Sequence, residues 1–260
     1  MLKPRTTLAA GIALFGSVIC FGLPTAAAAQ DQTPKTTPAS EPRAVLELFT
    51  SQGCSSCPPA DALMQTFAAR KDVIALSMPV DYWDYLGWKD TLANPKFSQL
   101  QRLYAKQRGD GRVYTPQMVV NGRTHVIGSN KTSIETAIAS TDEELRRSRV
   151  PVEVHADKRH VYIETGAAPE GARYKEATIW LVMALPVVEV KIQRGENRGK
   201  TIKYYNVVRE MNPIGMWSGK TAKLTLPRDA LPGRNNMLCA IIIQAGRAGP
   251  IIGAASYNGL

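Results

Sequence analysis

Cysteine and histidine are scarce in this sequence, which has four cysteines and three histidines among 260 residues. Small disulfide-rich scaffolds need a much higher density of cysteine, so that class of protein is excluded. A structural zinc site usually takes four Cys or His ligands at short spacings, and no second C-x-x-C or C-x-x-H accompanies the pair Cys54 and Cys57. We therefore expect no bound metal, and these two cysteines are the main candidates for chemistry.

Internal repeats are absent as well, because no segment recurs at a fixed period, which excludes solenoids and propellers. Hydrophobic residues make up 44% of the chain, enough for a packed core. Basic residues outnumber acidic ones by 32 to 22, but most are dispersed, as is typical of a solvated surface. The densest basic stretch runs from Lys191 to Arg209, and a polyanion site there is the less favoured alternative. We expect no nucleic-acid partner.

The N-terminus has the order of a secretory signal peptide. A basic n-region comes first, residues Leu8 to Leu23 are almost wholly apolar, and small residues continue to Ala29. The apolar run is short for a membrane span of about 20 residues, so an anchor is the less favoured alternative. We expect cleavage after Ala29, which removes Cys20 and leaves a periplasmic or secreted protein without a membrane span. Disulfides can form in that compartment.

The rest of the chain divides by its hydrophobic patterns. Strand and helix patterns alternate first, in the order β-α-β-α-β-β-α, and such units favour a sheet covered by helices. Afterwards seven or eight short β-rich runs predict a small antiparallel sandwich. The expected parts are a signal peptide (1–29), a flexible leader (30–43), an α/β domain (44–148) and a β-rich domain (149–260).

Caps and turns mark the elements of the α/β domain. Asn94-Pro95 suits a helix N-cap and first position, Asn121-Gly122 is a two-residue hairpin signal, and Ser129 is expected to cap the last helix. The predicted elements are the strand Ala44–Thr50, the helix Pro58–Arg70, the strand Asp72–Val80, a helix from Pro95 to near Gly109, the hairpin strands Pro116–Asn121 and Arg123–Ile127, and a last helix that bears Ile134, Ala137 and Ile138.

This order places the two cysteines between a strand and a helix. A helix N-terminus carries partial positive charge and free N–H donors, which stabilise the reactive thiolate. Cys57 follows Cys54 by three residues and can close a disulfide with it. Cys54 would attack a substrate disulfide, and Cys57 would resolve the mixed disulfide. A static disulfide and a copper(I) site, with His125 as a further ligand, remain open at this point.

A Thr-Pro pair strengthens the redox interpretation. The C-x-x-C at a strand–helix junction, together with Thr115-Pro116 in VYTPQMVV, resembles the thioredoxin superfamily over residues 44–140. LELFTSQGCSSC is similar to a glutaredoxin-type strand that leads directly into its cysteines. The resemblance implies a cis peptide bond before Pro116, and it implies that Thr115 and Pro116 position the substrate beside the cysteines.

A closer resemblance spans nearly the whole mature chain. The stretches VLELFTSQGCSSCPPAD, VDYWDYLGWKD, YTPQMVVNG and GENRGKTIKYYNVVR are similar to a family of bacterial secreted proteins known as DUF1223. The name of the family records that its function is unassigned. The resemblance implies a thioredoxin-like domain (44–148) followed by a β-rich domain (149–260), and it implies no particular substrate.

Several side chains are candidates to assist the cysteines. Tyr82 and Trp83 follow the second strand and could contact a substrate, although an aromatic-rich connection that packs on the domain is an equal alternative. Asp81 and Asp84 in the same stretch, and Glu47 in the first strand, are candidate proton shuttles. For Glu47, a salt-bridged structural role is the favoured alternative.

The leading hypothesis is an exported thiol–disulfide oxidoreductase that needs no cofactor. Its partners would be protein or small-molecule thiols and disulfides, and a redox partner in the membrane or periplasm. The alternative is a non-enzymatic thioredoxin-like protein that binds a partner or handles copper(I). The third mature cysteine, Cys239, lies in an apolar strand and is expected to be a buried structural thiol. The sequence favours neither direction of electron transfer.

Overall fold

The computed structural model describes residues 41–231 and 236–258, together with residues 2, 4 and 6. The expected signal peptide and most of the expected leader lie outside the described residues. Within the described part of the chain, no helix is both long and apolar enough to cross a membrane.

The described residues form strands, helices and three short 3-10 turns. The strands are β1 (Ala44–Thr50), β2 (Val73–Pro79), β3 (Gln117–Val120), β4 (Thr124–Ile127), β5 (Val152–Ala156), β6 (His160–Thr165), β7 (Ala177–Lys191), β8 (Thr201–Trp217), β9 (Ala222–Pro227), β10 (Leu238–Gln244) and β11 (Ile251–Asn258). The α-helices are α1 (Pro58–Ala68), α2 (Pro95–Arg108) and α3 (Lys131–Leu145).

The first four strands form one end of a sheet, in the order β2-β1-β3-β4. Strand β1 runs parallel to β2 and antiparallel to β3, and β3 forms a hairpin with β4. Successive side chains of β1 point to opposite faces of the sheet. Leu46 and Leu48 pack in one cluster with side chains of α1 and α3, whereas Val45 and Phe49 pack with side chains of α2. Helices therefore cover both faces of this part of the sheet.

Two helix boundaries differ from the sequence prediction. Helix α1 ends at Ala68 rather than Arg70, whose guanidinium turns to Asp72 and Glu135. The cap of α3 is Asn130 rather than Ser129, because a turn after β4 places Asn130 in extended backbone at the helix start. Its side-chain oxygen accepts a hydrogen bond from the backbone N–H of Ser133 at 3.0 Å. The expected Asn94 cap of α2 is confirmed.

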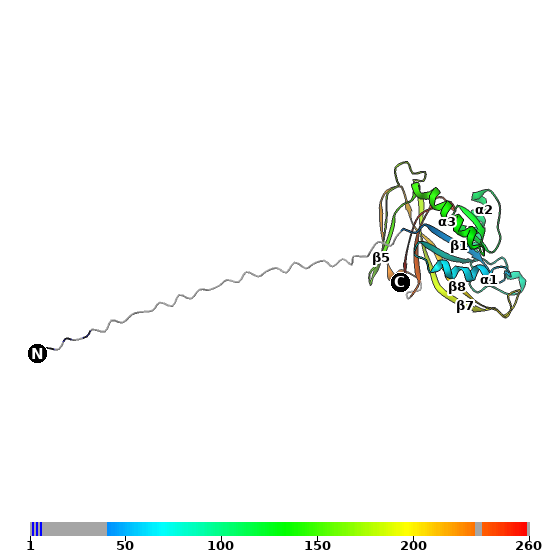
Figure 1. The fold of residues 1–260 in the computed structure, drawn as a ribbon, viewed down its shortest axis with the longest axis horizontal. Helices are drawn as coiled ribbons and strands as arrows, with labels where there is room; N and C mark the ends of the chain where they lie inside the picture. Colours follow the sequence, from blue (N-terminus) through cyan, green and yellow to red (C-terminus); the bar gives the residue numbers. More distant parts are fainter. Residues whose placement is uncertain (1, 3, 5, 7–40, 232–235, 259–260) are drawn as a thin grey trace. The chain divides into compact units, whose positions relative to one another are not determined.

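The β-rich region continues the same sheet. Strands β7 and β8 form a long antiparallel hairpin, and β8 pairs in parallel with β2 at Ser77 and Val207. The Asn206 side chain donates to the carbonyl of Ala75 at 2.9 Å, and the Ser77 hydroxyl donates to the carbonyl of Tyr205 at 2.7 Å. The complete order is β11-β10-β7-β8-β2-β1-β3-β4. Figure 1 shows β8 beside α1.

This continuity corrects the expectation of a separate sandwich. The protein is a mixed α/β structure with a large eight-stranded sheet, and it contains a second sheet of three strands in the order β5-β6-β9. Ile163 of the small sheet packs in one cluster with Ile241 and Trp217 of the large sheet. A sandwich-like layer therefore exists, but one of its two sheets is the far end of the large sheet. Strand β8 covers the edge of β2, which would otherwise expose unpaired backbone groups.

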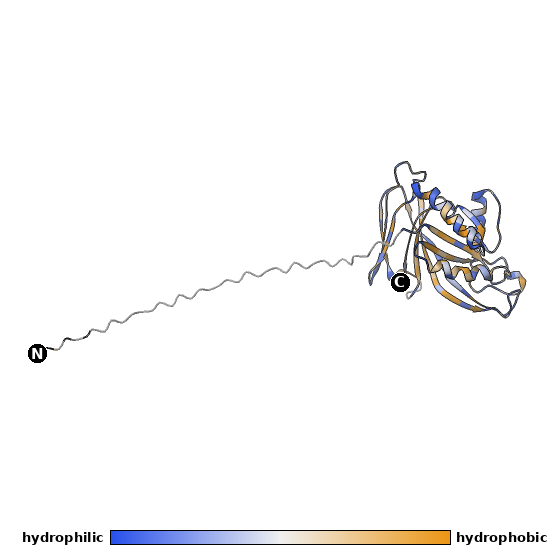
Figure 2. Ribbon diagram, in the orientation of Figure 1, coloured by the Kyte–Doolittle hydropathy of each residue, from blue (hydrophilic) through white to orange (hydrophobic). Residues whose placement is uncertain are grey.

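The core follows the strands of both sheets. Figure 2 shows apolar residues concentrated on the strands of the large sheet, with hydrophilic residues on the outer parts of the helices. Cys239 lies in β10 and is fully buried as a free thiol, as predicted from its apolar surroundings. Burial raises the pKa of this thiol to about 12, which suits an inert structural residue.

Candidate functional site

The two neighbouring cysteines form a disulfide in the loop between β1 and α1. Cys57 is the N-cap residue of α1, and its carbonyl accepts hydrogen bonds from the N–H groups of Ala60 at 2.8 Å and Asp61 at 3.1 Å. Cys54 precedes it in the turn, where the N–H of Cys57 donates to the carbonyl of Cys54 at 3.2 Å. Helix α1 therefore begins directly after the disulfide, as the sequence predicted.

The Thr115-Pro116 turn lies beside this disulfide. Its peptide bond is cis, as the resemblance implied. The Ser56 hydroxyl lies 3.4 Å from the sulfur of Cys54 and donates to the carbonyl of Thr115 at 3.5 Å. The structure thus brings together two segments that are about sixty residues apart in the sequence, with Ser56 between them.

Trp83 contacts both the Thr115-Pro116 turn and the disulfide loop. Its indole N–H donates to the hydroxyl of Thr115 at 2.8 Å. A Cβ atom at Gly53 would lie 3.0 Å from the Cβ of Trp83, so a larger residue at this position would have to push Trp83 away. Tyr85 stacks on Trp83 with ring centroids 6.5 Å apart and is 77% exposed. Tyr82 instead donates its hydroxyl hydrogen to Gln101 of α2 at 3.1 Å.

The predicted proton shuttles have other hydrogen-bond partners. Asp81 accepts a hydrogen bond from the hydroxyl of Ser98, and Asp84 accepts one from the N–H of Asp90 at 3.0 Å. Glu47 lies on the face covered by α2, where Tyr104 donates to it at 2.6 Å. Burial raises the pKa of Glu47 to about 7. Among the described residues, no hydrogen bond links these three carboxyl groups to the disulfide loop.

Asp61 is a buried carboxyl group close to Cys57 that sequence reasoning missed. It lies in the first turn of α1, four residues after Cys57, and accepts a hydrogen bond from the Thr50 hydroxyl at 2.7 Å. Its second carboxyl oxygen is buried without a partner in the described structure. Burial raises the pKa of Asp61 to about 8, and the charge of Asp90 adds to this shift. Burial therefore favours the neutral form of Asp61 and brings its pKa into the range in which it can exchange a proton.

The tip of the β7–β8 hairpin holds the disulfide loop in place. Asn197 is fully buried there, and its side-chain amide donates to the carbonyl of Gln52 at 2.9 Å and to the carbonyl of Cys54 at 2.8 Å. The ammonium of Lys200 donates to the oxygen of the same amide at 2.8 Å. The stretch GENRGK stands out in the sequence through the family resemblance and through its place in the basic stretch from Lys191 to Arg209, and neither feature predicts this contact over 143 residues.

Gln52 also connects the loop to the aromatic segment, residues 81–90, which follows β2 and is rich in Tyr and Trp. Its N–H donates to Asp90 at 2.8 Å, and its side-chain oxygen accepts from the indole of Trp88 at 2.7 Å. The loop is therefore bound by the aromatic segment, the Thr-Pro turn and the hairpin tip. Cys54 is only 1% exposed, whereas Ser55 and Ser56 are exposed. The two serines form the side of the loop that meets solvent.

His125, the candidate third copper ligand, is bound elsewhere. One ring nitrogen lies 2.8 Å from the Tyr114 hydroxyl, and the other lies 3.1 Å from the carboxylate of Asp110. Burial lowers the pKa of His125. Across the described residues, no group of three or more His, Cys, Asp and Glu side chains is arranged to hold a metal ion.

The fold and site define a mixed α/β protein with a C-x-x-C disulfide at a strand–helix junction. The chain belongs to the DUF1223 family, described as a protein of unknown function, which matches residues 45–244. It is 32% identical to a protein of Agrobacterium tumefaciens with a known crystal structure, at a TM-score of 0.73, covering 83% of this chain and 94% of that one.

A second solved structure shares the fold at much lower identity. HBP35 of Porphyromonas gingivalis is 12% identical, with a TM-score of 0.55, and the match covers 84% of this chain and 75% of that one. None of the curated proteins matches the sequence.

Proposed function

We propose that this protein is an exported thiol–disulfide oxidoreductase whose first region is a thioredoxin-like domain. The strand order β2-β1-β3-β4, with helices on both faces, supports that fold. One observation carries the function: the Cys54–Cys57 disulfide lies at the N-terminus of α1, with the Thr115-Pro116 turn against it. The helix terminus favours a thiolate at this place, as catalysis requires.

The reaction transfers two electrons. In the reducing direction, the Cys54 thiolate attacks one sulfur of a substrate disulfide, which forms a mixed disulfide and releases the other substrate sulfur as a thiolate. Cys57 then loses its proton and attacks the sulfur of Cys54. The Cys54–Cys57 disulfide closes, the second substrate thiolate leaves, and the substrate has been reduced. The oxidising direction reverses the same steps. A thiol or disulfide partner in the membrane or periplasm would restore the starting state.

Asp61 is our candidate for the proton transfer to and from Cys57. A useful general base has a pKa near the working pH, and the raised pKa of Asp61, about 8, meets that condition. Asp61 also lies one helical turn after Cys57, and its backbone N–H donates to the carbonyl of Cys57. Glu47 has a raised pKa as well, but its hydrogen-bond partner is Tyr104 of α2.

Trp83 and Tyr85 are our candidates for substrate contact. Both belong to the aromatic segment that touches the Thr-Pro turn, and their stacked rings offer a flat apolar surface beside the disulfide loop. The exposed Tyr85 would pack on an apolar part of a peptide or a small thiol, while the hydrogen bond to Thr115 fixes Trp83.

Insulin reduction with dithiothreitol as the electron source tests the proposal. We expect Cys54→Ser to abolish the activity, and we expect Cys57→Ser to accumulate a mixed disulfide with substrate, because Cys54 can attack but nothing resolves the product. Cys239→Ser is the matched control and should retain activity, since that thiol is buried in β10. Equal activity of the wild type and Cys54→Ser, in reduction and in disulfide-forming assays, would refute the proposal.

An anaerobic copper(I) titration of the reduced protein separates this proposal from copper handling. An oxidoreductase should show cysteine-dependent disulfide exchange, whether or not copper(I) binds weakly to the free thiols. Tight copper(I) binding that requires both Cys54 and Cys57, together with no exchange activity, would favour the non-enzymatic alternative.

A further inference from the structure

A cavity lies outside the disulfide site, and none of its lining residues belongs to the segments that hold the disulfide loop. It has a volume of about 740 Å³ and is lined by the end of α2, the β3–β4 turn, the segment before β7 and the β10–β11 turn. This volume lies within the range of small-molecule sites, about 300–1,000 Å³. The cavity therefore has room for a ligand larger than a single water molecule or ion.

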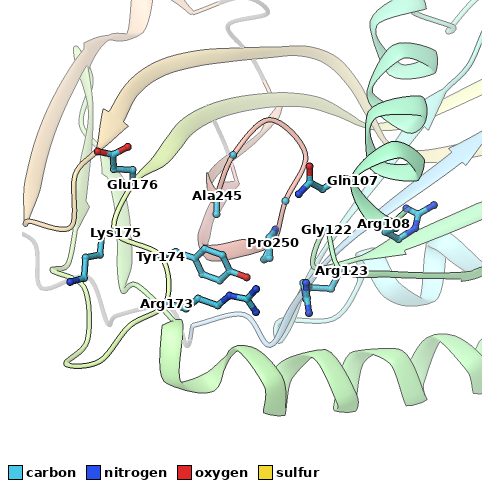
Figure 3. Close-up of a pocket in the computed structure, with 12 residues that line it drawn as sticks. Gln107, Arg108, Gly122, Arg123, Arg173, Tyr174, Lys175, Glu176, Ala245 and Pro250 are labelled. Carbon is cyan, nitrogen blue, oxygen red and sulfur yellow. The ribbon is translucent and has the colours of Figure 1, made fainter. Parts of the chain in front are cut away.

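Two arginines from different segments face the same part of this cavity. In Figure 3, the guanidinium groups of Arg173 and Arg123 both point into the space below Pro250, and the Tyr174 hydroxyl points there too. The carboxylate of Glu176, which also lines the cavity, points away from them. Hydrogen-bond donors with positive charge thus converge from two sides of the cavity.

The two arginines differ in whether an acidic side chain neutralises their charge. Arg123 forms an ion pair with Glu144, which does not line this cavity. In contrast, Arg173 makes no ion pair with any described residue, and its guanidinium lies over the ring of Tyr174 at 5.5 Å from the centroid. Two guanidinium groups that share one space repel each other, so an anion between them would be attracted to both.

The floor of the cavity consists of backbone at the contact between two turns. A Cβ atom at Gly122 would lie only 2.3 Å from the carbonyl oxygen of Gly249, so a larger residue there would push the β3–β4 and β10–β11 turns apart. The contact is further fixed by the N–H of Ile251, which donates to the carbonyl of Asn121 at 2.9 Å. The absence of a side chain at Gly122 therefore lets the two turns approach, and Arg123, the next residue, faces Arg173 across the cavity (Figure 3).

We infer that this cavity binds a small molecule through an oxyanion, a phosphate or a carboxylate, that is held between Arg123 and Arg173. The planar guanidinium group matches both kinds of oxyanion with two parallel hydrogen bonds. The Tyr174 hydroxyl adds a neutral donor, and Gln107 reaches toward the same cavity from the end of α2. The inference is independent of the redox function, because the cavity uses none of the cysteines.

Titration calorimetry at low salt, with the disulfide intact, tests this inference. The probes are pyrophosphate for a phosphate ligand and citrate for a carboxylate ligand. We expect saturable one-to-one binding of at least one probe, weakened about tenfold or more by Arg173→Ala, which loses a charge-assisted pair. Because Arg173 makes no ion pair with any described residue, this variant should fold as the wild type does, and its circular dichroism and unfolding midpoint verify that.

The matched control is Arg247→Ala, which removes the same charge from an exposed arginine of the β10–β11 turn that does not line this cavity. It should leave the affinity within about twofold of the wild type, since Arg247 does not line the cavity. A repeat of both titrations at about 0.15 M salt screens the general effect of its exposed charge. Binding of one probe but not the other identifies the oxyanion. No saturable binding of either probe, or equal losses in Arg173→Ala and Arg247→Ala, would overturn the inference.

Discussion

At the scale of single residues, Asp61 combines burial with an unpaired oxygen atom. Burial disfavours the charged form of a carboxyl group, so the folded protein holds this proton to a pKa of about 8, far above the ordinary value of 3.8. Between these two pH values the folded state binds one proton more than the unfolded state. The free energy of unfolding therefore falls as pH rises through that window.

We predict that Asp61→Asn removes this part of the pH dependence. The asparagine side chain resembles the neutral acid in shape, so the variant should be close to wild-type stability near pH 4, where the decline begins, and more stable than the wild type near pH 8. One proton corresponds to a slope of about 1.4 kcal/mol per pH unit. Urea unfolding of the oxidised protein at several pH values measures how the free energy of unfolding depends on pH.

Glu47→Gln is the comparison for that experiment. Burial raises the pKa of Glu47 only to about 7, so its contribution is lost between about pH 4.5 and pH 7. From pH 7 to pH 8 the decline should persist in Glu47→Gln and disappear in Asp61→Asn. A decline that persists equally in both variants would show that Asp61 is ionised in the folded protein at neutral pH.

The same pair of variants tests the role of Asp61 in proton transfer. We expect Asp61→Asn to slow disulfide exchange about tenfold or more near pH 7 and to steepen its dependence on pH, because hydroxide must then deprotonate Cys57. Glu47→Gln should keep the pH profile of the wild type. Stopped-flow fluorescence of the reduced protein with a model disulfide gives the profiles, and an unchanged profile in Asp61→Asn would limit that residue to a structural role.

The residues of the site differ in how far the sequence reveals them. The place of Cys54 and Cys57 could be predicted because short local patterns mark a strand end and a helix start, whereas Thr115-Pro116 was indicated by the resemblance to the thioredoxin superfamily. An aspartate in the first helical turn has an ordinary explanation, the helix dipole, so nothing in the sequence marks Asp61 as special. Asp61 is bonded to Thr50 of β1, and β8, from a distant part of the chain, packs against the helix that carries it.

At the scale of elements, the β7–β8 hairpin is the part of the second region that reaches the disulfide. Its tip presents Asn197, whose two hydrogen bonds satisfy the buried carbonyls of Gln52 and Cys54. The hairpin therefore helps to hold the loop that carries Cys54 in its conformation. The residue ranges of its strands could be approximated from the apolar runs, but the contact of its tip could not, because a hairpin pattern does not specify what its turn touches.

We predict that Asn197→Ala destabilises the oxidised protein by about 1–3 kcal/mol, because it leaves two buried carbonyls without their shared donor. The loss of order should be local: amide hydrogen exchange should increase in residues 51–57 more than in the strands of the sheet. Asn197→Asp should be worse than Asn197→Ala, since a carboxylate next to two carbonyl oxygens is repelled by both.

Asn212→Ala provides the matched control in the same strand pair. Asn212 is exposed in β8 and donates to Glu210 at 2.9 Å, away from the disulfide loop. Its removal should change stability by less than about 0.5 kcal/mol, as is usual for an exposed polar residue. If Asn197→Ala and Asn212→Ala left the exchange of residues 51–57 equally unchanged, the hairpin tip would not be holding the loop.

At the scale of the whole molecule, the two halves of the described chain share one sheet. The α/β order of the first half could be predicted from alternating periodicities, which are local. The parallel pairing of β8 with β2 could not, since it joins Ser77 to Val207 across a long intervening segment and no turn signal specifies it. The first cluster of the core mixes side chains of β1, β2 and α2 with those of β7, β8, β10 and β11. Each half therefore buries part of its apolar side chains against the other half.

We predict that the oxidised protein unfolds in urea as one cooperative unit. The four tryptophans allow a direct test, since Trp83 and Trp88 lie in the first half and Trp180 and Trp217 in the second. A variant with Trp83→Phe and Trp88→Phe reports only on the second half, and one with Trp180→Phe and Trp217→Phe reports only on the first. Within each variant, the fluorescence midpoint should equal the circular dichroism midpoint, because coincident probes indicate a two-state transition. This comparison holds even if the substitutions lower stability, since both midpoints come from the same variant. Separate midpoints would show that the shared sheet joins two domains that fold independently.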